Sequence, residues 1–285
     1  MKKEILLQDW YLKISSNAKL PERFAFPKEG LSVEIPGTVH SNLLKARLIP
    51  DPFYGDNETR LQWIHEIDWI YFTFFDIPDS MSLEDPLFLR FEGIDTISEI
   101  YLNGNLICTT ENMFRSYEID IKPWIKKVQN HLEIKITSPT KYARQQENKY
   151  GKLPVALSSE RVYLRKAQYS FGWDWGPKFP TMGIWKSVAL IQPQSAWIES
   201  VKFYTKSLKK NKASVLIHIN VAGKFNQLLL TVDLDDGEKS IRKEINTKKN
   251  KSVKFELSIK NPKLWWPNGE SKAHLYHLKI ILDLF

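Results

Sequence analysis

The sequence Phe-Gly-Trp-Asp-Trp-Gly-Pro occupies residues 171–177 and is the most distinctive stretch of the chain. It places three large aromatic side chains, two glycines and one carboxylate in seven positions. Gly172, Gly176 and Pro177 disfavour both a long helix and an uninterrupted strand, because they suit tight turns and positive φ angles. The stretch therefore predicts that Asp174 lies in a loop with an indole ring on either side.

Two interpretations of this loop stand side by side. In the first, the loop binds a sugar: a pyranose ring presents C–H groups to an aromatic face, and one carboxylate accepts charge-assisted hydrogen bonds from two neighbouring hydroxyls. In the second, the indole rings fill a core and Asp174 accepts hydrogen bonds from nearby backbone N–H groups. Composition alone does not decide between them.

Upstream of this loop the sequence alternates with period two, which is typical of half-buried strands. Residues 69–75 are apolar on both sides and predict a strand covered on two faces. Asn103-Gly104 lies between two strand-like segments and supplies the two positive φ angles of a type I′ hairpin turn. These patterns predict an antiparallel β-sandwich.

One segment breaks the alternation. Residues 36–46 begin with Pro-Gly-Thr and then place Val39, Leu43 and Leu44 on one face of a short helix, with Thr38 as its cap. Residues 49–58, Ile-Pro-Asp-Pro-Phe-Tyr-Gly-Asp-Asn-Glu, predict an irregular loop, which is either a binding loop or a structural plug.

The pattern changes after Gln192. Five apolar alternating segments follow at regular spacing, as in an immunoglobulin-like sandwich. We therefore predict one domain over residues 1–192 and a second over 193–285. The last segment runs into Phe285 without a closing turn, so we expect this sandwich to lack its final strand and to leave an unpaired edge.

Length, charge and cysteine content narrow the possible functions. At 285 residues the chain suits two domains, and its single cysteine, Cys108, excludes an intramolecular disulfide. We expect no bound metal and no cofactor, since the sequence has no Cys/His cluster, phosphate loop or dinucleotide fingerprint. No apolar run is long enough to span a bilayer, so we expect no membrane association. The compartment stays open: cytoplasmic, or periplasmic, secreted or lysosomal if a leader was removed.

The net charge of +8 is unevenly distributed. Residues 1–192 contain 24 Lys and Arg against 24 Asp and Glu, whereas residues 193–285 contain 17 against 9. The excess lies in residues 206–212 and 242–251, where no aromatic residues are interleaved for stacking on bases. We therefore expect solvated hairpin tips and no nucleic-acid partner.

Taken together, the motifs resemble the N-terminal region of the β-mannosidases of glycoside hydrolase family 2. They run in the family's order across nearly the whole chain, and the motif Gly-Trp-Asp-Trp-Gly-Pro is the most specific of them. The matching segments are residues 36–40, 49–58, 62–63, 91–96, 101–104, 112–115, 165–177, 183–185 and 264–269.

The resemblance implies a galactose-binding-like jelly roll followed by an immunoglobulin-like sandwich. In the family these domains precede a (β/α)₈ barrel that carries two catalytic glutamates, and the barrel is absent from this sequence. A retaining glycosidase needs both carboxylates, so we expect no catalytic residue in this chain. Asn57-Glu58 superficially resembles the barrel's Asn-Glu dipeptide, but it lies in the first domain and is assigned no catalytic role.

The resemblance also assigns site residues. It implies that Asp174 hydrogen-bonds hydroxyls of a terminal mannose and that Trp173 lines the same subsite. Arg165 and Gln168 are expected to steer Asp174 or to contact the barrel. Trp175, Phe171 and Trp185 are expected to pack.

Three functions follow as alternatives. The chain is the N-terminal part of a retaining exo-β-mannosidase, inactive alone, whose partners are β-mannoside glycans and the barrel of the same protein. Alternatively, it is a free-standing, lectin-like carbohydrate-binding module. Thirdly, it is a structural or adhesive β-protein, a function for which the predicted architecture is the only support. An oligomer is compatible with all three.

Overall fold

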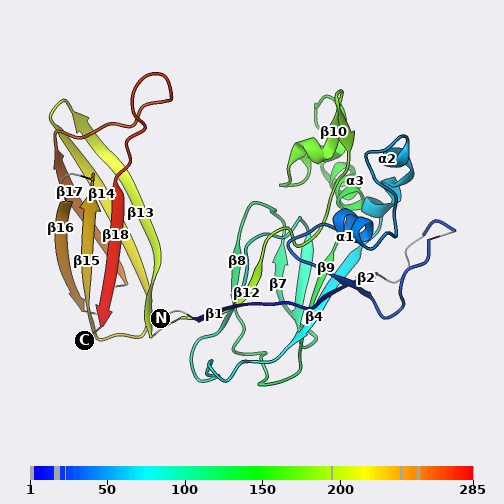
Figure 1. Ribbon diagram of the computed structural model, residues 1–285, viewed down its shortest axis with the longest axis horizontal. Helices are drawn as coiled ribbons and strands as arrows, with labels where there is room; N and C mark the ends of the chain where they lie inside the picture. The colour runs from blue at the N-terminus through cyan, green and yellow to red at the C-terminus, as the bar shows by residue number, and fades with distance from the viewer. Residues whose placement is uncertain are drawn as a thin grey trace. The chain divides into compact units, whose positions relative to one another are not determined.

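The computed structural model describes residues 3–15, 20–22, 24–193, 195–237, 240–248 and 251–284. The chain divides into two compact units between Gln192 and Pro193, and both are built from antiparallel sheets (Figure 1). The predicted all-β class, with two successive β-sandwiches, is confirmed. Phe285, with which the last predicted segment ends, lies outside the described residues.

The first unit contains two main sheets. The six-stranded sheet consists, in spatial order, of β3 (Leu31–Val33), β2 (Trp10–Ile14), β4 (Trp69–Phe75), β9 (Asn130–Ile136), β6 (Ser98–Leu102) and β7 (Asn105–Thr110). The four-stranded sheet consists of β1 (Lys3–Leu6), β12 (Val188–Gln192), β5 (Phe88–Phe91) and β8 (Tyr117–Asp120).

Both sheets contribute to one hydrophobic core. Leu132 and Ile134 of the larger sheet and Leu89 and Leu190 of the smaller one are almost completely buried in the same cluster. Alternate residues of a strand point to opposite faces, so each strand offers one apolar row to this core. The prediction that β4 is covered on both faces is wrong at Phe74, which is 59% exposed.

Two local predictions from the sequence are confirmed. Asn103 and Gly104 have φ angles of +52° and +82° and join β6 to β7, as a type I′ turn requires. Thr38 caps the short helix α1 (Val39–Lys45), and its side chain accepts a hydrogen bond from the backbone N–H of Ser41. Val39 and Leu43 are fully buried on the inner face of this helix, whereas Leu44, which was predicted on the same face, is 39% exposed.

Other helical segments were not predicted. They are α2 (Asn57–Arg60), whose first two residues belong to the loop expected to be irregular, α3 (Pro139–Tyr150) and the short 3₁₀ helices η1 (Gln62–Glu66), η2 (Ser159–Val162) and η3 (Gln168–Ser170). Ser138 caps α3, whose first residue is Pro139, and a Ser-Pro pair is a recognisable start signal. No helix within the described ranges is long and apolar enough to cross a membrane.

The second unit is a sandwich of two three-stranded sheets. One consists of β13 (Ala196–Lys209), β14 (Lys212–Gly223) and β17 (Ser252–Lys260), and the other of β16 (Ser240–Lys248), β15 (Gln227–Asp235) and β18 (His277–Leu284). Ile217 and Ile219 of the first sheet and Leu230 and Val232 of the second are completely buried in a shared cluster. This core is separate from that of the first unit.

The two lysine-rich segments differ in structure. Lys210 and Asn211 form the turn between β13 and β14, which confirms a hairpin tip there. Most of residues 242–251 instead lies within strand β16, so the prediction of a second tip is wrong for residues 242–248. Alternate apolar residues, Ile241 and Ile245, pack against the core of the unit and keep this segment extended. Lys249 and Asn250 lie outside the described residues.

Candidate functional site

Asp174 and Trp175 form the two-residue turn of a β-hairpin. Its strands are β10 (Phe171–Trp173) and β11 (Gly176–Lys178), and Trp173 lies opposite Gly176. Gly172 has a φ angle of +86°, and a Cβ atom there would approach Lys178 Cβ to 3.1 Å. Glycine therefore allows the two strands to lie this close, and Asp174 lies in a turn flanked by two indoles, as the sequence predicts.

The side chains of the turn are exposed. Trp173 is 45% exposed and Trp175 is 82% exposed, and Asp174 is exposed as well. The expectation that Trp175 packs is wrong, because a two-residue turn leaves its indole without neighbours on most sides. For Phe171 the expectation of packing is confirmed, because it is 2% exposed in a small cluster with Ala143 and Leu164.

A pocket of about 490 Å³ opens beside this hairpin. Its wall is mainly apolar and includes both Trp173 and Trp175, whereas Asp174, which lies between them in sequence, is not one of the lining residues. The lining residues are Phe53, Met113, Ala167, Tyr169, Ser170, Trp173, Trp175, Gly176, Pro177, Phe179 and Thr181. The volume and the aromatic wall suit a small ring-shaped ligand.

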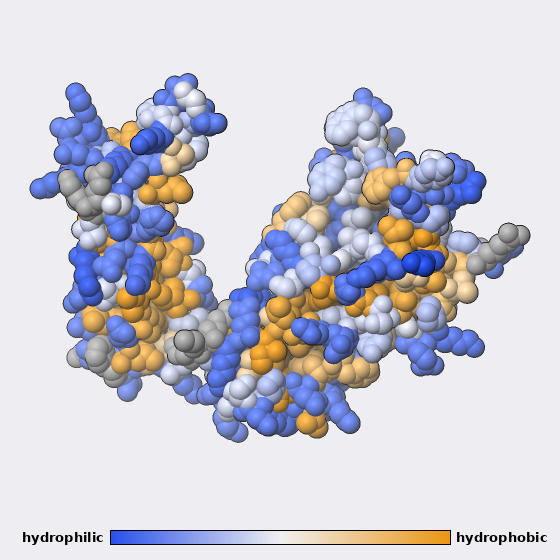
Figure 2. Space-filling model, viewed as in Figure 1, coloured by the Kyte–Doolittle hydropathy of each residue, from blue (hydrophilic) through white to orange (hydrophobic). Residues whose placement is uncertain are grey.

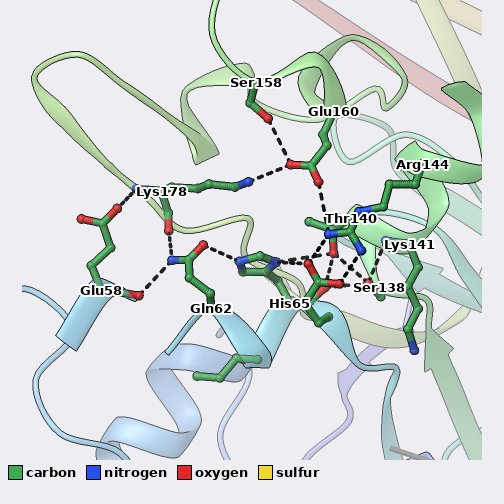
Figure 3. A network of polar contacts seen from close by, with 12 residues as sticks. Glu58, Gln62, His65, Ser138, Thr140, Lys141, Arg144, Ser158, Glu160 and Lys178 are labelled. Atoms are coloured by element: carbon green, nitrogen blue, oxygen red, sulfur yellow. Dashed lines mark hydrogen bonds and ion pairs between the residues drawn. The ribbon is translucent and has the colours of Figure 1, made fainter. Parts of the chain in front are cut away.

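The base of the hairpin is anchored through Lys178 (Figure 3). Its backbone N–H donates to Glu58 Oε1 at 2.7 Å, and its carbonyl accepts from Gln62 Nε2 at 2.9 Å. Its ammonium group donates to Glu160 Oε2 at 2.8 Å. Both the backbone and the side chain of Lys178 are thus fixed to separate segments, which holds the hairpin in place.

His65 extends this network into the interior (Figure 3). Its Nε2 lies 2.9 Å from Gln62 Oε1, and its backbone carbonyl accepts hydrogen bonds from Ser138 and Thr140. Because Gln62 Nε2 already donates to two carbonyls, Gln62 Oε1 is the acceptor and His65 Nε2 carries the proton. Burial lowers the pKa of His65 to about 4, despite the opposing charge of Glu66, so the ring is neutral.

Arg161 lies against the ring of Trp173. Its guanidinium carbon is 5.0 Å from the indole centroid, and the residue is only 8% exposed. Within the described part of the chain, Arg161 Nε and Nη1 have no hydrogen-bond partner. The ring of Trp173 thus faces this cation, and a desolvated cation–π contact is stronger than an exposed one.

A buried ion pair lies behind the pocket wall. Lys166 and Asp95, both almost fully buried, are joined through Nζ and Oδ2. Thr181, which lines the pocket, donates its hydroxyl to Asp95 Oδ2 at 3.1 Å. Burial lowers the pKa of Lys166, and the charge of Asp95 opposes this shift. The pair fixes Thr181 from behind and offers no free charge to the pocket.

A smaller hollow of about 230 Å³ shares Phe53, Phe179 and Thr181 with the pocket. Phe53 and Phe179 pack edge to face, with ring centroids 5.3 Å apart. His40 also lines it and is 6% exposed. Burial is the largest of the causes that lower the pKa of His40 to about 3, so its ring is neutral. Neither ring nitrogen has a hydrogen-bond partner among the described residues.

The two other predicted site residues, Arg165 and Gln168, are exposed near the hairpin. The carbonyl of Arg165 accepts a hydrogen bond from the N–H of Met113 at 3.0 Å, and Gln168 begins η3. Among the described residues, no hydrogen bond or ion pair joins either side chain to Asp174. The expectation that they steer Asp174 is therefore not supported by a direct contact.

Sequence reasoning missed the residues that anchor the hairpin. Glu58 was considered only as an apparent catalytic dipeptide, and its carboxylate instead accepts the backbone N–H of Lys178. Arg161 was given no role. The signal for Arg161 was weak, because a lone arginine is usually exposed.

The sequence matches two family descriptions. Residues 10–186 match the glycosyl hydrolase 2 galactose-binding domain-like family, and residues 196–284 match glycosyl hydrolases family 2. Together they cover nearly all of the described chain.

Several relatives are β-mannosidases. The chain is 32% identical to a β-mannosidase from Bos taurus over 89% of its own length and 31% of the relative. It is 30% identical to β-mannosidase B from Emericella nidulans over 98% of its own length and 33% of the relative. The chain therefore spans about a third of the length of the curated relatives it matches.

The chain is also similar to solved structures. The crystal structure of β-D-mannosidase from Dictyoglomus thermophilum superposes with a TM-score of 0.86 at 36% identity, covering 99% of this chain and 34% of that one. The exo-chitosanase CsxA from Amycolatopsis orientalis has a TM-score of 0.66 at 18% identity, over 99% of this chain and 32% of its own. The second match shows a shared fold alone.

Proposed function

Because the chain belongs to glycoside hydrolase family 2, we propose that it forms the N-terminal part of a β-mannosidase, which hydrolyses terminal non-reducing β-D-mannose residues. The named relatives at about 30% identity or above support this assignment. The chain contributes pocket residues and scaffold, and its partners are β-mannoside glycans and the catalytic domain of the same protein.

The observation that carries the proposal is the position of Asp174 in a turn whose two indole neighbours both line one pocket. Trp173 and Trp175 offer aromatic faces to the C–H groups of a pyranose ring. Asp174 is exposed, and its carboxylate accepts two sugar hydroxyls at the pocket rim. Arg161 and Lys178 fix the hairpin and thereby position its indole rings and the carboxylate of Asp174.

Bond cleavage is assigned elsewhere in the protein. Retaining glycosidases use two carboxyl groups about 5 to 5.5 Å apart, one as nucleophile and one as acid/base. Glu58 and Glu160 are both committed to Lys178, so neither acts as a free nucleophile. We place the catalytic pair in the catalytic domain and assign to this chain the binding of the sugar on the side away from the scissile bond.

The test compares this 285-residue chain with the full-length protein on a chromogenic β-mannoside. We expect turnover by the full-length protein and none by the chain alone, and an Asp174→Ala variant of the full-length protein should be impaired. Turnover by the chain alone would refute the proposed division of labour.

A carbohydrate-binding module is the second candidate, because the pocket is formed entirely by residues of the first unit. It predicts that the chain alone binds mannose with measurable affinity. Titration calorimetry of the chain with mannose and mannobiose, with Asp174→Ala as control, separates the candidates. Half of an enzyme pocket should bind either sugar weakly or not at all.

A further inference from the structure

The hollow beside the sugar pocket contains a buried side chain whose hydrogen-bonding groups are unused. His40 lines this hollow of about 230 Å³ and is only 6% exposed. Neither Nδ1 nor Nε2 of its ring has a hydrogen-bond partner among the described residues. Because buried polar groups in folded proteins are almost always hydrogen-bonded, the ring indicates a place where a ligand supplies the partner.

The ring of His40 is held from two sides. The residue lies in the first turn of α1, which the capping box of Thr38 and Ser41 stabilises. Its ring meets that of Phe179 edge to face, with the two centroids 5.7 Å apart. An imidazole held in this way loses little freedom when a ligand binds, which favours recognition.

The hydroxyl groups that line the hollow have already committed their protons. Thr38 Oγ1 donates to Ser41 Oγ at 3.3 Å, and Ser41 Oγ donates to the carbonyl of Thr38 at 2.9 Å. Thr181 Oγ1 donates to Asp95 Oδ2 at 3.1 Å and accepts from Lys166 Nζ at 3.3 Å. These hydroxyls can therefore only accept further hydrogen bonds, and the imidazole supplies the free N–H of the hollow.

The lining of the hollow defines the chemical class of its ligand. A neutral imidazole has one N–H donor and one acceptor nitrogen, and a hydroxyl group can pair with either. None of the described lining residues carries a charge, so an ionic ligand would lose its hydration without gaining a counter-ion. Phe53 and Phe179 offer aromatic surface to C–H groups. These properties suit a neutral, hydroxylated ring.

The hollow continues the pocket that we assign to the terminal mannose. The two share Phe53, Phe179 and Thr181. Along the chain, Phe179 and Thr181 follow β11, whereas Asp174 lies in the turn at the other end of this strand. The hollow therefore adjoins the end of the pocket opposite to Asp174, which in the proposed function is the side of the scissile bond. Figure 2 shows apolar surface on the part of the first unit that carries α1 and β10 in Figure 1.

We propose that the hollow is a second sugar subsite, in which His40 hydrogen-bonds a hydroxyl of the sugar unit next to the terminal mannose. This subsite presupposes the proposed function and extends it, because it makes mannosides of two or more sugar units the preferred substrate class. The hollow of about 230 Å³ has about half the volume of the pocket of about 490 Å³, so it holds one side of the second ring.

Kinetics of the full-length protein test the subsite. Mannobiose carries the second sugar, whereas a chromogenic aryl β-mannoside replaces it with a ring that lacks its hydroxyls. His40→Leu removes both ring nitrogens. It should lower the ratio of kcat/KM for mannobiose to kcat/KM for the aryl mannoside roughly three- to tenfold, as expected when one neutral hydrogen bond is lost.

Two further variants separate hydrogen bonding from other effects on the ratio. His40→Gln keeps one donor and one acceptor in its amide group, so it should restore much of the ratio. Asp174→Ala is the matched control, because Asp174 is assigned to the terminal sugar that both substrates share. It should lower both values of kcat/KM and leave their ratio unchanged.

A measurement on the wild-type chain decides the matter if His40→Leu does not fold. The described lining of the hollow comes entirely from the first unit, so the 285-residue chain contains it. NMR of isotope-labelled imidazole rings follows the chain as mannobiose is added, with the His40 signals assigned from the His40→Gln variant. We expect these signals to shift and those of His277, which belongs to the second unit, to stay in place.

Each result supports or overturns the subsite. A preference for mannobiose that falls in His40→Leu and returns in His40→Gln supports it. An unchanged ratio in a folded His40→Leu variant overturns it, as do unmoved His40 signals if that variant does not fold, and the partner of the ring is then a water molecule or another part of the protein. Failure of the wild-type, full-length protein to cleave either mannoside would overturn the proposed function, and the subsite with it.

Discussion

Glu58 and Lys178 are 120 residues apart in sequence and are joined by a 2.7 Å hydrogen bond from the backbone N–H of Lys178 to Glu58 Oε1. This contact connects the loop around α2 to β11, the strand that follows the Asp174–Trp175 turn. The hairpin contains only three residues in each strand, and an isolated hairpin of this size is unstable in water. Its conformation therefore depends on such anchors from outside.

Removal of this anchor should loosen the hairpin. Glu58→Ala leaves the partly buried N–H of Lys178 without its acceptor and should reduce the free energy of unfolding of the first unit by about 1 to 3 kcal/mol. Glu58→Gln keeps an accepting oxygen and should cost less than about 1 kcal/mol. Urea denaturation compares the two, and equal losses for Ala and Gln would exclude the hydrogen bond as the cause.

Arg161 and Trp173 should be energetically coupled. A double-mutant cycle with Arg161→Met and Trp173→Leu isolates their contact from the separate effects of losing a buried charge and an aromatic ring. We expect a favourable coupling of about 0.5 to 2 kcal/mol in the free energy of unfolding, because the guanidinium is almost completely desolvated. If the effects of the two single substitutions simply add, the guanidinium and the indole lie 5.0 Å apart without stabilising each other.

Acid should destabilise the first unit through His40 and His65. The pKa of each is lowered by burial, from 6.5 to about 3 and about 4 respectively. In the window below pH 6.5 the unfolded chain binds protons that the folded chain does not, so stability falls as the pH falls. This loss stops near pH 4 for His65 and near pH 3 for His40.

The expected size of this effect is about 2 kcal/mol per histidine between pH 7 and pH 5. Urea denaturation of the first unit at both pH values measures the sum, and the variants His40→Leu and His65→Gln should each remove part of the difference. Unchanged stability at pH 5 would contradict neutral, buried rings.

The sequence predicted those features of the fold that local chemistry determines. Asn103 and Gly104 specify a turn by their φ preferences, and Thr38 specifies a helix cap. Strands such as β9 are visible because Leu132, Ile134 and Ile136 alternate with polar residues. These signals lie within a few positions of the feature they specify.

Features that depend on distant partners were missed. Trp175 was expected to pack, but its exposure is decided by the two-residue turn and by the absence of neighbours within the described residues. The role of Glu58 requires knowledge that β11 lies beside α2. The aromatic neighbours of Asp174 were visible in the sequence, whereas the anchors that hold them come from segments as far apart as residues 58, 62 and 160.

Asp174 is the residue on which the proposed sugar site depends most. In the full-length protein, Asp174→Ala should lower kcat/KM by a factor that corresponds to about 2 to 4 kcal/mol of transition-state binding, as expected when a charged partner is lost from a site that the bound sugar desolvates. Asp174→Asn keeps the shape and one accepting oxygen, so it should lie between Ala and wild type. Because Asp174 is exposed in a turn, neither change should alter the free energy of unfolding by more than about 0.5 kcal/mol. Steady-state kinetics on a chromogenic β-mannoside, paired with urea denaturation, separates binding from folding. An unchanged kcat/KM would remove Asp174 from the site, and a fall that parallels lost stability would assign it a structural role.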